Sequence, residues 1–215
     1  MLNSYSVFEG ELEYACSEYK HLRIRERGGI KYLSGIIDVC DTEGTVIQSF
    51  FIEIHHSEKY PYRFPLMYEV GGYIPNSPDW HKYSDDLCCL TAEPIEIITC
   101  KTGITLCSFI QNHAIPYLAN QYYRKEFGQY KNEYSHGLIG LYQAYSDIMK
   151  TMDVSLWRQY LMYAFGPTKV TVSRNEVCFC GSGKKYKHCH LQVFQNLRNL
   201  GKDTVCKHLQ ILKVI

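Results

Sequence analysis

Four residues near the C-terminus of this 215-residue sequence have the types and the spacing of a metal site. Cys178 and Cys180 are separated by one residue, and after an eight-residue spacer Cys189 is followed directly by His190. Thiolates and an imidazole in a group of four suit a tetrahedral Zn²⁺ ion, and two glycines in the segment allow the chain to turn tightly around it. We predict one structural zinc ion. Four protein ligands leave no open position for a substrate, so we assign this site no catalysis.

The spelling of this segment resembles the SEC-C motif, a zinc hook found at the end of the bacterial preprotein translocase ATPase and on many unrelated bacterial proteins. The resemblance covers about fifteen residues and matches at Cys178, Cys180, Gly181, Ser182, Gly183, Lys187, Cys189 and His190. It implies a docking module, because the hook of the translocase binds a chaperone and phospholipid.

A second group of residues with chemical potential lies between residues 60 and 91. It contains the turn Tyr60-Pro61-Tyr62…Pro65, the pair Pro75-Asn76 and the pair Cys89-Leu90. In order and spelling this segment resembles the ubiquitin-conjugating enzymes, and most closely their divergent bacterial relatives, some of which sit in antiphage operons. In that family a helix and an antiparallel meander lead through a Tyr-Pro-Phe…Pro turn into a third strand, a His-Pro-Asn element and an active cysteine followed by leucine.

The sequence departs from the family pattern at two places. Ile74 stands where the family has histidine, and Asn76 lies thirteen residues before Cys89 instead of about eight. His81, eight residues before Cys89, has the spacing at which the family keeps its asparagine.

Thioester transfer requires a thiol nucleophile, a donor for the tetrahedral oxyanion and a group that deprotonates the incoming amine. Cys89 can be the thiol, and His81 could lower its pKa if the loop folds back. Asn76 or His81 could supply the oxyanion donor, and Asp85 or Asp86 could favour amine deprotonation. The alternative for each is structural: Cys89 as a small buried apolar residue, His81 as a surface histidine, and Asn76, Asp85 and Asp86 as turn residues.

The two adjacent cysteines should have different roles. Neighbouring side chains of an extended chain point in opposite directions, so only one of the pair should face the loop cleft. Because Cys89 precedes the leucine, we predict that it is the nucleophile and that Cys88 is a packing residue.

The pattern predicts an α+β fold with an antiparallel meander. Apolar residues at helical spacing predict a helix over residues 7–26, which Gly28-Gly29 would stop. Three β-branched and aromatic runs predict strands over residues 31–40, 45–56 and 65–74.

The remainder of the chain is predicted to be a long loop followed by helices. Residues 75–102 contain three prolines and several Asp, Asn and Ser residues, so we predict a loop of functional length there. Helical spacing returns over residues 105–123, where Pro116 should kink or end the helix, and again over 137–150 and 154–165.

Charge divides the sequence into two regions, which we predict to be domains. Residues 1–166 carry 14 Lys/Arg and 20 Asp/Glu, a net charge of −6, whereas residues 167–215 carry 9 and 2, a net charge of +7. We predict a conjugating-enzyme-like domain with extra C-terminal helices over 1–166, and a zinc hook with a terminal helix over 167–215. The basic region could bind an acidic partner or dock on its own acidic domain.

Two functions are compatible with these features. In the first, the protein is a cytoplasmic transferase that carries a ubiquitin-like modifier or another acyl group on Cys89 and passes it to a protein target, with the hook recruiting the target or an activating enzyme. The Cys-Leu pair and Trp80-His81 favour it. In the second, the same fold is an inactive adaptor that docks partners through the hook, and the irregular position of Asn76 favours this.

Other classes of function are less compatible with the sequence. The sequence contains no run of eighteen apolar residues, the length that would predict a membrane span, and the N-terminus lacks the pattern of a secretory signal. We therefore expect a cytoplasmic protein with reduced cysteines. The basic region has neither the aromatic pattern nor the recognition helix of a nucleic-acid-binding protein.

Overall fold

The computed structural model describes residues 3–131, 133–166 and 172–215, and Pro167 and Lys169 of the predicted basic region lie outside these ranges. The chain forms two compact units. Unit 1 consists of Met1–Thr91 and Thr99–Glu133, and unit 2 consists of Ala92–Ile98 and Tyr134–Ile215. The boundary predicted at residue 166 therefore lies inside unit 2, since the two helices before it share an apolar core with the hook.

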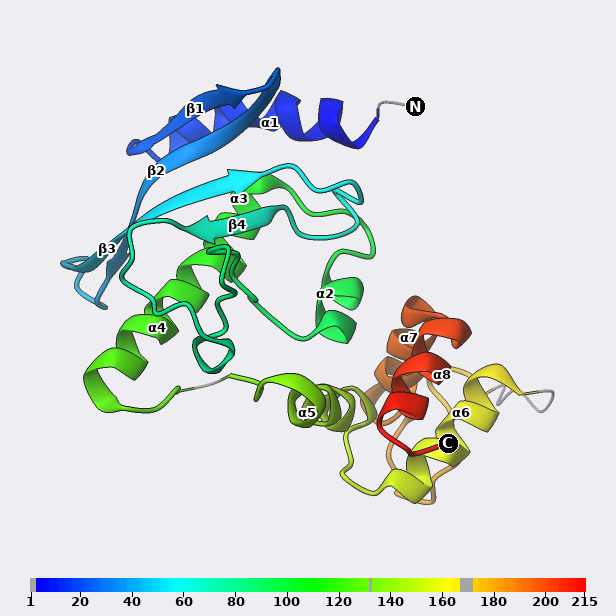
Figure 1. The fold of residues 1–215 in the computed structure, drawn as a ribbon. Coiled ribbons are helices and arrows are strands. Elements are labelled where there is room, and N and C mark those ends of the chain that lie inside the picture. The colour runs from blue at the N-terminus through cyan, green and yellow to red at the C-terminus, as the bar shows by residue number, and fades with distance from the viewer. Residues whose placement is uncertain (1–2, 132, 167–171) are drawn as a thin grey trace. The chain divides into compact units, whose positions relative to one another are not determined.

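Unit 1 is a mixed α+β structure whose four strands form one antiparallel sheet in the order β1-β2-β3-β4 (Figure 1). The elements in chain order are α1 (Ser4–Glu18), β1 (Leu22–Arg27), β2 (Ile30–Cys40), β3 (Val46–His55), β4 (Leu66–Glu69), α3 (Leu106–Phe109), η2 (Ile110–Ala114) and α4 (Ile115–Phe127). The side chain of Asn3 accepts a hydrogen bond from the backbone N–H of Ser6 and caps α1.

The helix predicted over residues 7–26 is wrong in its second half. Helix α1 ends at Glu18, and Leu22–Arg27 pairs with β2 as a fourth strand. Gly28 and Gly29, both at positive φ, form the tight turn between the two strands. The alternation of Leu22 and Ile24 with arginines is a strand pattern, and only its pairing with β2 decides between strand and helix.

The segment predicted as a loop over residues 75–102 also contains regular structure. A 3₁₀ turn, η1, covers Pro78–Trp80, and a short helix, α2, covers Glu93–Thr99. Pro94 lies in the first turn of α2, where the missing backbone N–H has no intrahelical partner in any case.

Pro116 does not end the predicted helix, because the helical path continues past it into α4. The chain passes from α3 through the π-helical turn η2 into α4, with Pro116 in the first turn of α4. The wider π-helical turn shifts the hydrogen-bond register just before the proline, so its ring and missing N–H are accommodated. Helix α4 ends at Phe127, and Gly128 caps it in the left-handed conformation.

One face of the sheet and the helices enclose the core of unit 1. Helix α1 contributes Phe8 and Leu12, the strands contribute Leu33 and Ile52, and α4 contributes Leu118, all nearly inaccessible to solvent. This packing positions β4 and the segment that follows it, which carries the cysteine pair.

Unit 2 is helical. Its further elements are α5 (Gly137–Met149), α6 (Val154–Phe165), η3 (Tyr186–His188), α7 (Leu191–Leu200) and α8 (Lys202–Ile211). Trp157 of α6 and Phe194 of α7 lie in its core together with Cys178 of the hook. Three isoleucines of α2 pack against this cluster, and His208 Nε2 lies 3.2 Å from a carboxylate oxygen of Glu93. Helix α2 therefore belongs to unit 2.

None of the helices in the described part of the chain is both long and apolar enough to cross a bilayer.

Gly35 in β2 tests the packing of the sheet. A Cβ atom there would lie 2.1 Å from the carbonyl oxygen of His21, so Gly35→Ala should destabilise the protein by about 3 kcal/mol, the upper part of the range for overpacking. Gly10→Ala, in α1 with open space around it, should instead stabilise by about 1 kcal/mol. Urea denaturation of the two variants checks both values, and equal stabilities would contradict this account of the sheet.

Candidate functional site

The predicted metal-binding segment, residues 178–190, which we call the hook, is a tight loop that leads into the first turn of α7. Cys178 donates its backbone N–H to the carbonyl of Lys184 at 2.8 Å, which closes the loop. Gly181 and Gly183 both have positive φ, so the chain reverses between Cys178 and η3 at little steric cost. Cys189 and His190 follow η3 directly, and His190 is the residue before α7.

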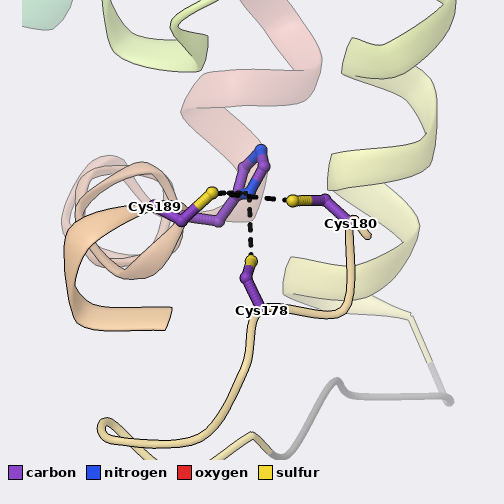
Figure 2. A group of neighbouring side chains, drawn as sticks. Cys178, Cys180 and Cys189 are labelled. Atoms are coloured by element: carbon purple, nitrogen blue, oxygen red, sulfur yellow. Dashed lines mark hydrogen bonds between the residues drawn. The ribbon is translucent and has the colours of Figure 1, made fainter. Parts of the chain in front are cut away.

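This backbone brings the four predicted ligands together. Figure 2 shows the side chains of Cys178, Cys180 and Cys189 converging on one point. The Sγ atoms of Cys180 and Cys189 are 3.5 Å apart, and Nδ1 of His190 lies 3.3 Å from Cys178 Sγ and 3.2 Å from Cys189 Sγ. All four ligand atoms lie within 4.8 Å of one another.

These separations fit a tetrahedral zinc ion. Zn–S bonds of about 2.3 Å place two sulfur ligands about 3.8 Å apart, close to the 3.5 Å between the Sγ atoms of Cys180 and Cys189. When bound, the metal would cross-link the loop to the start of α7 as a closed structural site. The predicted set of three thiolates and one imidazole is therefore available in the fold.

The electrostatics around the ligands differ. Burial raises the pKa of Cys178 to about 11, whereas hydrogen bonds from the hydroxyl and backbone of Ser182 lower the pKa of Cys180 to about 7. Burial, with a smaller effect of Lys150, lowers the pKa of His190 and favours the neutral imidazole that binds metals. Metal binding requires deprotonated ligands, so it should release the proton of Cys178.

The comparisons with known proteins identify this segment. Residues 174–192 match the SEC-C motif, so the chain carries that motif there. Segments of the chain are similar to the protein translocase subunit SecA of Pseudomonas fluorescens (68% identity over 22 residues), Stutzerimonas stutzeri (69% over 26 residues) and Ehrlichia ruminantium (76% over 21 residues). These matches cover 10%, 12% and 10% of this chain and only 2%, 3% and 2% of those proteins. No solved structure matches the chain.

A buried ion pair organises the cysteine loop of unit 1, which we define as residues 70–91. Lys82 and Glu69 have side chains with no solvent exposure, and Lys82 Nζ donates to Glu69 Oε2 at 2.8 Å. The carboxylate of Glu69 also accepts the backbone N–H groups of Tyr73 and Ile74, and Lys82 Nζ donates to the carbonyl of Ile74 and lies 3.0 Å from Asp86 Oδ1. Burial alone lowers the pKa of Lys82, but the bonds to the two carboxylates outweigh it and raise the pKa.

The loop places the two cysteines in different environments. Cys88 is 6% exposed, and burial raises the pKa of its thiol to about 12. Cys89 is half-buried, and its backbone N–H donates to the carbonyl of His81 at 2.7 Å. Cys88 therefore lies in the core, and Cys89 is the accessible member of the pair.

The other predicted site residues are distributed around the loop. His81 is 7% exposed, has positive φ, and its ring meets the ring of Tyr130 edge-on at 5.5 Å. The exposed Asn76 donates its side-chain amide to the carbonyl of Ser84 and to Asp86 Oδ1, and Asp85 accepts the backbone N–H of Leu87. Among these contacts, the backbone hydrogen bond from Cys89 to His81 joins one predicted site residue to the candidate nucleophile.

One neighbour of Cys89 was not singled out from the sequence. The pKa of Tyr83 is raised, first by the thiolate of Cys89, then by burial and by a hydrogen bond to the same sulfur. Tyr83 is therefore an electrostatic neighbour of the candidate nucleophile. Tyr83 follows Lys82, and the isolated bridge between Lys82 and Cys88 sets the two segments side by side. Residue spacing in the sequence does not predict the pairing of Lys82 with Cys88.

The first site prediction concerns the metal. The purified protein should contain close to one zinc ion per chain, and Cys178→Ser/Cys180→Ser should lose it. We expect hydrogen exchange to accelerate throughout unit 2, including α5 and α6, while unit 1 stays protected, because α5, α6 and the hook share a core. Cys206→Ser, in α8 of the same unit, is the control and should retain the metal. Freshly purified, unchelated protein without zinc would exclude the metal centre.

The second site prediction concerns the buried ion pair. Lys82→Ala leaves the Glu69 carboxylate buried without its counter-charge and should cost about 3–5 kcal/mol in the free energy of unfolding. Lys31→Ala, which removes an exposed lysine 2.9 Å from Glu9, should have little effect. Chemical denaturation of unit 1 provides the comparison, and equal stabilities for the two variants would show that the ion pair does not hold the loop.

Proposed function

We propose that unit 1 carries an acyl group, such as the C-terminus of a ubiquitin-like modifier, as a thioester on Cys89 and transfers it to an amine of a target protein. The hook of unit 2 serves as the docking element for the target or for an activating enzyme. Some of the bacterial conjugating-enzyme-like proteins that the sequence resembles lie in antiphage operons. We therefore propose that this activity be sought in defence against phage.

The order of elements in unit 1 supports this proposal. A helix, an antiparallel meander and the Tyr60-Pro61 turn lead into β4 and then to Cys89-Leu90. Apart from the additional strand β1, this is the order that the resemblance to ubiquitin-conjugating enzymes implies.

The single observation that carries the proposal is the environment of Cys89. It is the accessible cysteine of the pair, it lies on a loop that a buried ion pair holds, and its backbone N–H donates to the carbonyl of His81. A rigid support for a reactive thiol reduces the entropy lost on reaching the geometry of reaction.

The proposed reaction has two balanced steps. The Cys89 thiolate attacks the carbonyl carbon of a donor thioester, a new Sγ–C bond forms, and the donor thiolate leaves. A target amine then attacks the same carbon, the Sγ–C bond breaks with return of the electron pair to Cys89, and the amine proton passes to a base. The Tyr83 hydroxyl or the His81 ring would stabilise the oxyanion, and Asp85, which is exposed, would favour removal of the proton.

A specific observation favours the alternative, an adaptor without thioester chemistry. The side-chain amide of Asn76, which the family resemblance would assign to the oxyanion, instead bridges Ser84 and Asp86 within the loop. In this alternative the loop is a scaffold, and the hook with its exposed Lys184 and Lys185 docks an acidic partner.

The decisive variants are Cys89→Ala and Cys88→Ala. In cells of the source organism, wild-type protein and Cys88→Ala should form an adduct that disappears on treatment with dithiothreitol, and Cys89→Ala should form none. Non-reducing denaturing electrophoresis followed by mass spectrometry measures this. If wild type and Cys89→Ala behave alike and no adduct forms, the protein is the adaptor.

Iodoacetamide labelling of the purified native protein is a control that requires no modifier. Cys89 should react much faster than Cys88, because the thiol of Cys88 is buried and has a pKa raised to about 12.

The oxyanion donor can be identified from single-turnover discharge of the adduct to free lysine. Tyr83→Phe or His81→Ala should slow discharge roughly 10²-fold, equivalent to about 2.7 kcal/mol in the barrier, according to which residue supplies the donor. Tyr68→Phe is a matched tyrosine control in the same unit and should leave the rate unchanged. Wild-type rates in both test variants would remove these two residues from the mechanism.

A further inference from the structure

A tyrosine outside the SEC-C motif reaches one of the four metal ligands. Tyr160 lies in α6, whereas the motif begins at residue 174. Its hydroxyl oxygen is 2.7 Å from Nε2 of His190, and the two rings meet edge-on with centroids 5.0 Å apart. Tyr160 is only 6% exposed, so little water competes for this contact.

The chemistry of the ligand set determines the direction of this hydrogen bond. Nδ1 of His190 faces the sulfurs of Cys178 and Cys189 and is therefore the nitrogen that would bind zinc. A metal-bound nitrogen holds no proton, so the proton of the neutral ring resides on Nε2. Nε2–H then donates to the hydroxyl oxygen of Tyr160.

We infer that Tyr160 is a positioning residue for the zinc ligand His190. Its hydroxyl would fix the tautomer that leaves Nδ1 free for a metal, and it holds the imidazole ring in its present orientation. Metal-bound histidines commonly use their second nitrogen in this way, and loss of such a partner costs 10- to 100-fold in metal affinity. Through this bond α6 completes a site whose four ligands all come from the motif.

The hydroxyl can be separated from the packing of the ring. The Tyr160 ring also meets Phe194 of α7, with centroids 5.9 Å apart, and Tyr160→Phe keeps that contact while removing the hydrogen-bond acceptor. Tyr163, one turn further along α6, is a matched control. Its hydroxyl accepts from Gln159 Nε2 at 2.9 Å, and its ring meets Phe179 of the hook.

The test measures zinc transfer from the full-length protein to a competing chelator. Tyr160→Phe should hold zinc 10- to 100-fold more weakly than wild type, and Tyr163→Phe should match wild type. Circular dichroism of the zinc-loaded variants verifies that the helices are intact. Equal zinc affinities for wild type and Tyr160→Phe would overturn the inference, as would the absence of zinc from the wild-type protein.

A spectroscopic measurement on the wild type makes the test independent of how the variants fold. The ¹⁵N chemical shifts of the His190 ring should show a metal-bound Nδ1 and a protonated Nε2, and the Nε2 proton should exchange slowly with solvent. In Tyr160→Phe that proton should exchange faster. A ring that binds zinc through Nε2, or a proton with equal exchange in both proteins, would contradict the role of Tyr160.

Discussion

Three cysteine sulfurs and one imidazole nitrogen gathered within 4.8 Å of one another impose the constraint on which unit 2 depends. Thiolates at such short distances repel one another, and protonated thiols offer only weak hydrogen bonds in return. A divalent cation converts the same arrangement into a cross-link. Because α7 begins at the residue after His190 and supplies Val193, Phe194 and Leu197 to the core, a fixed ligand set also fixes where α7 enters that core.

In unit 1 a buried ion pair, made by protein groups alone, holds a loop in place. The ammonium group of Lys82 and the carboxylate of Glu69 are both removed from water, and each makes further hydrogen bonds to the backbone. Removal of one partner is costly in such a pair, although the pair as a whole need not add stability. It links β4 to Tyr73, Ile74, Lys82 and Asp86 of the cysteine loop, which otherwise contains little regular structure.

The two proposed functions differ in what this fixed loop is for. A loop held by a buried ion pair and carrying an accessible cysteine suits a nucleophile that must be held for transfer. The same rigidity suits a binding surface, and the side chain of Asn76 contributes to it through Ser84 and Asp86. Either function uses the hook in the same way, since a closed metal site contributes shape and charge to a docking surface without chemistry of its own.

The sequence by itself determined the features whose partners are close along the chain. The four metal ligands lie within thirteen residues and could be predicted from spacing alone, as could three of the four strands. A metal ligand set of this kind is local because a short loop and one helix end are enough to build it.

The tertiary structure decided the features that depend on distant partners. Pairing with β2 made Leu22–Arg27 a strand, and contact with α7 placed α5 and α6 in unit 2. Burial between the sheet and α4 separated Cys88 from Cys89, and Tyr160 reached His190 across thirty residues of sequence. Apolar periodicity and residue spacing describe one segment at a time, so the environment of a side chain becomes definite only when the segments pack together.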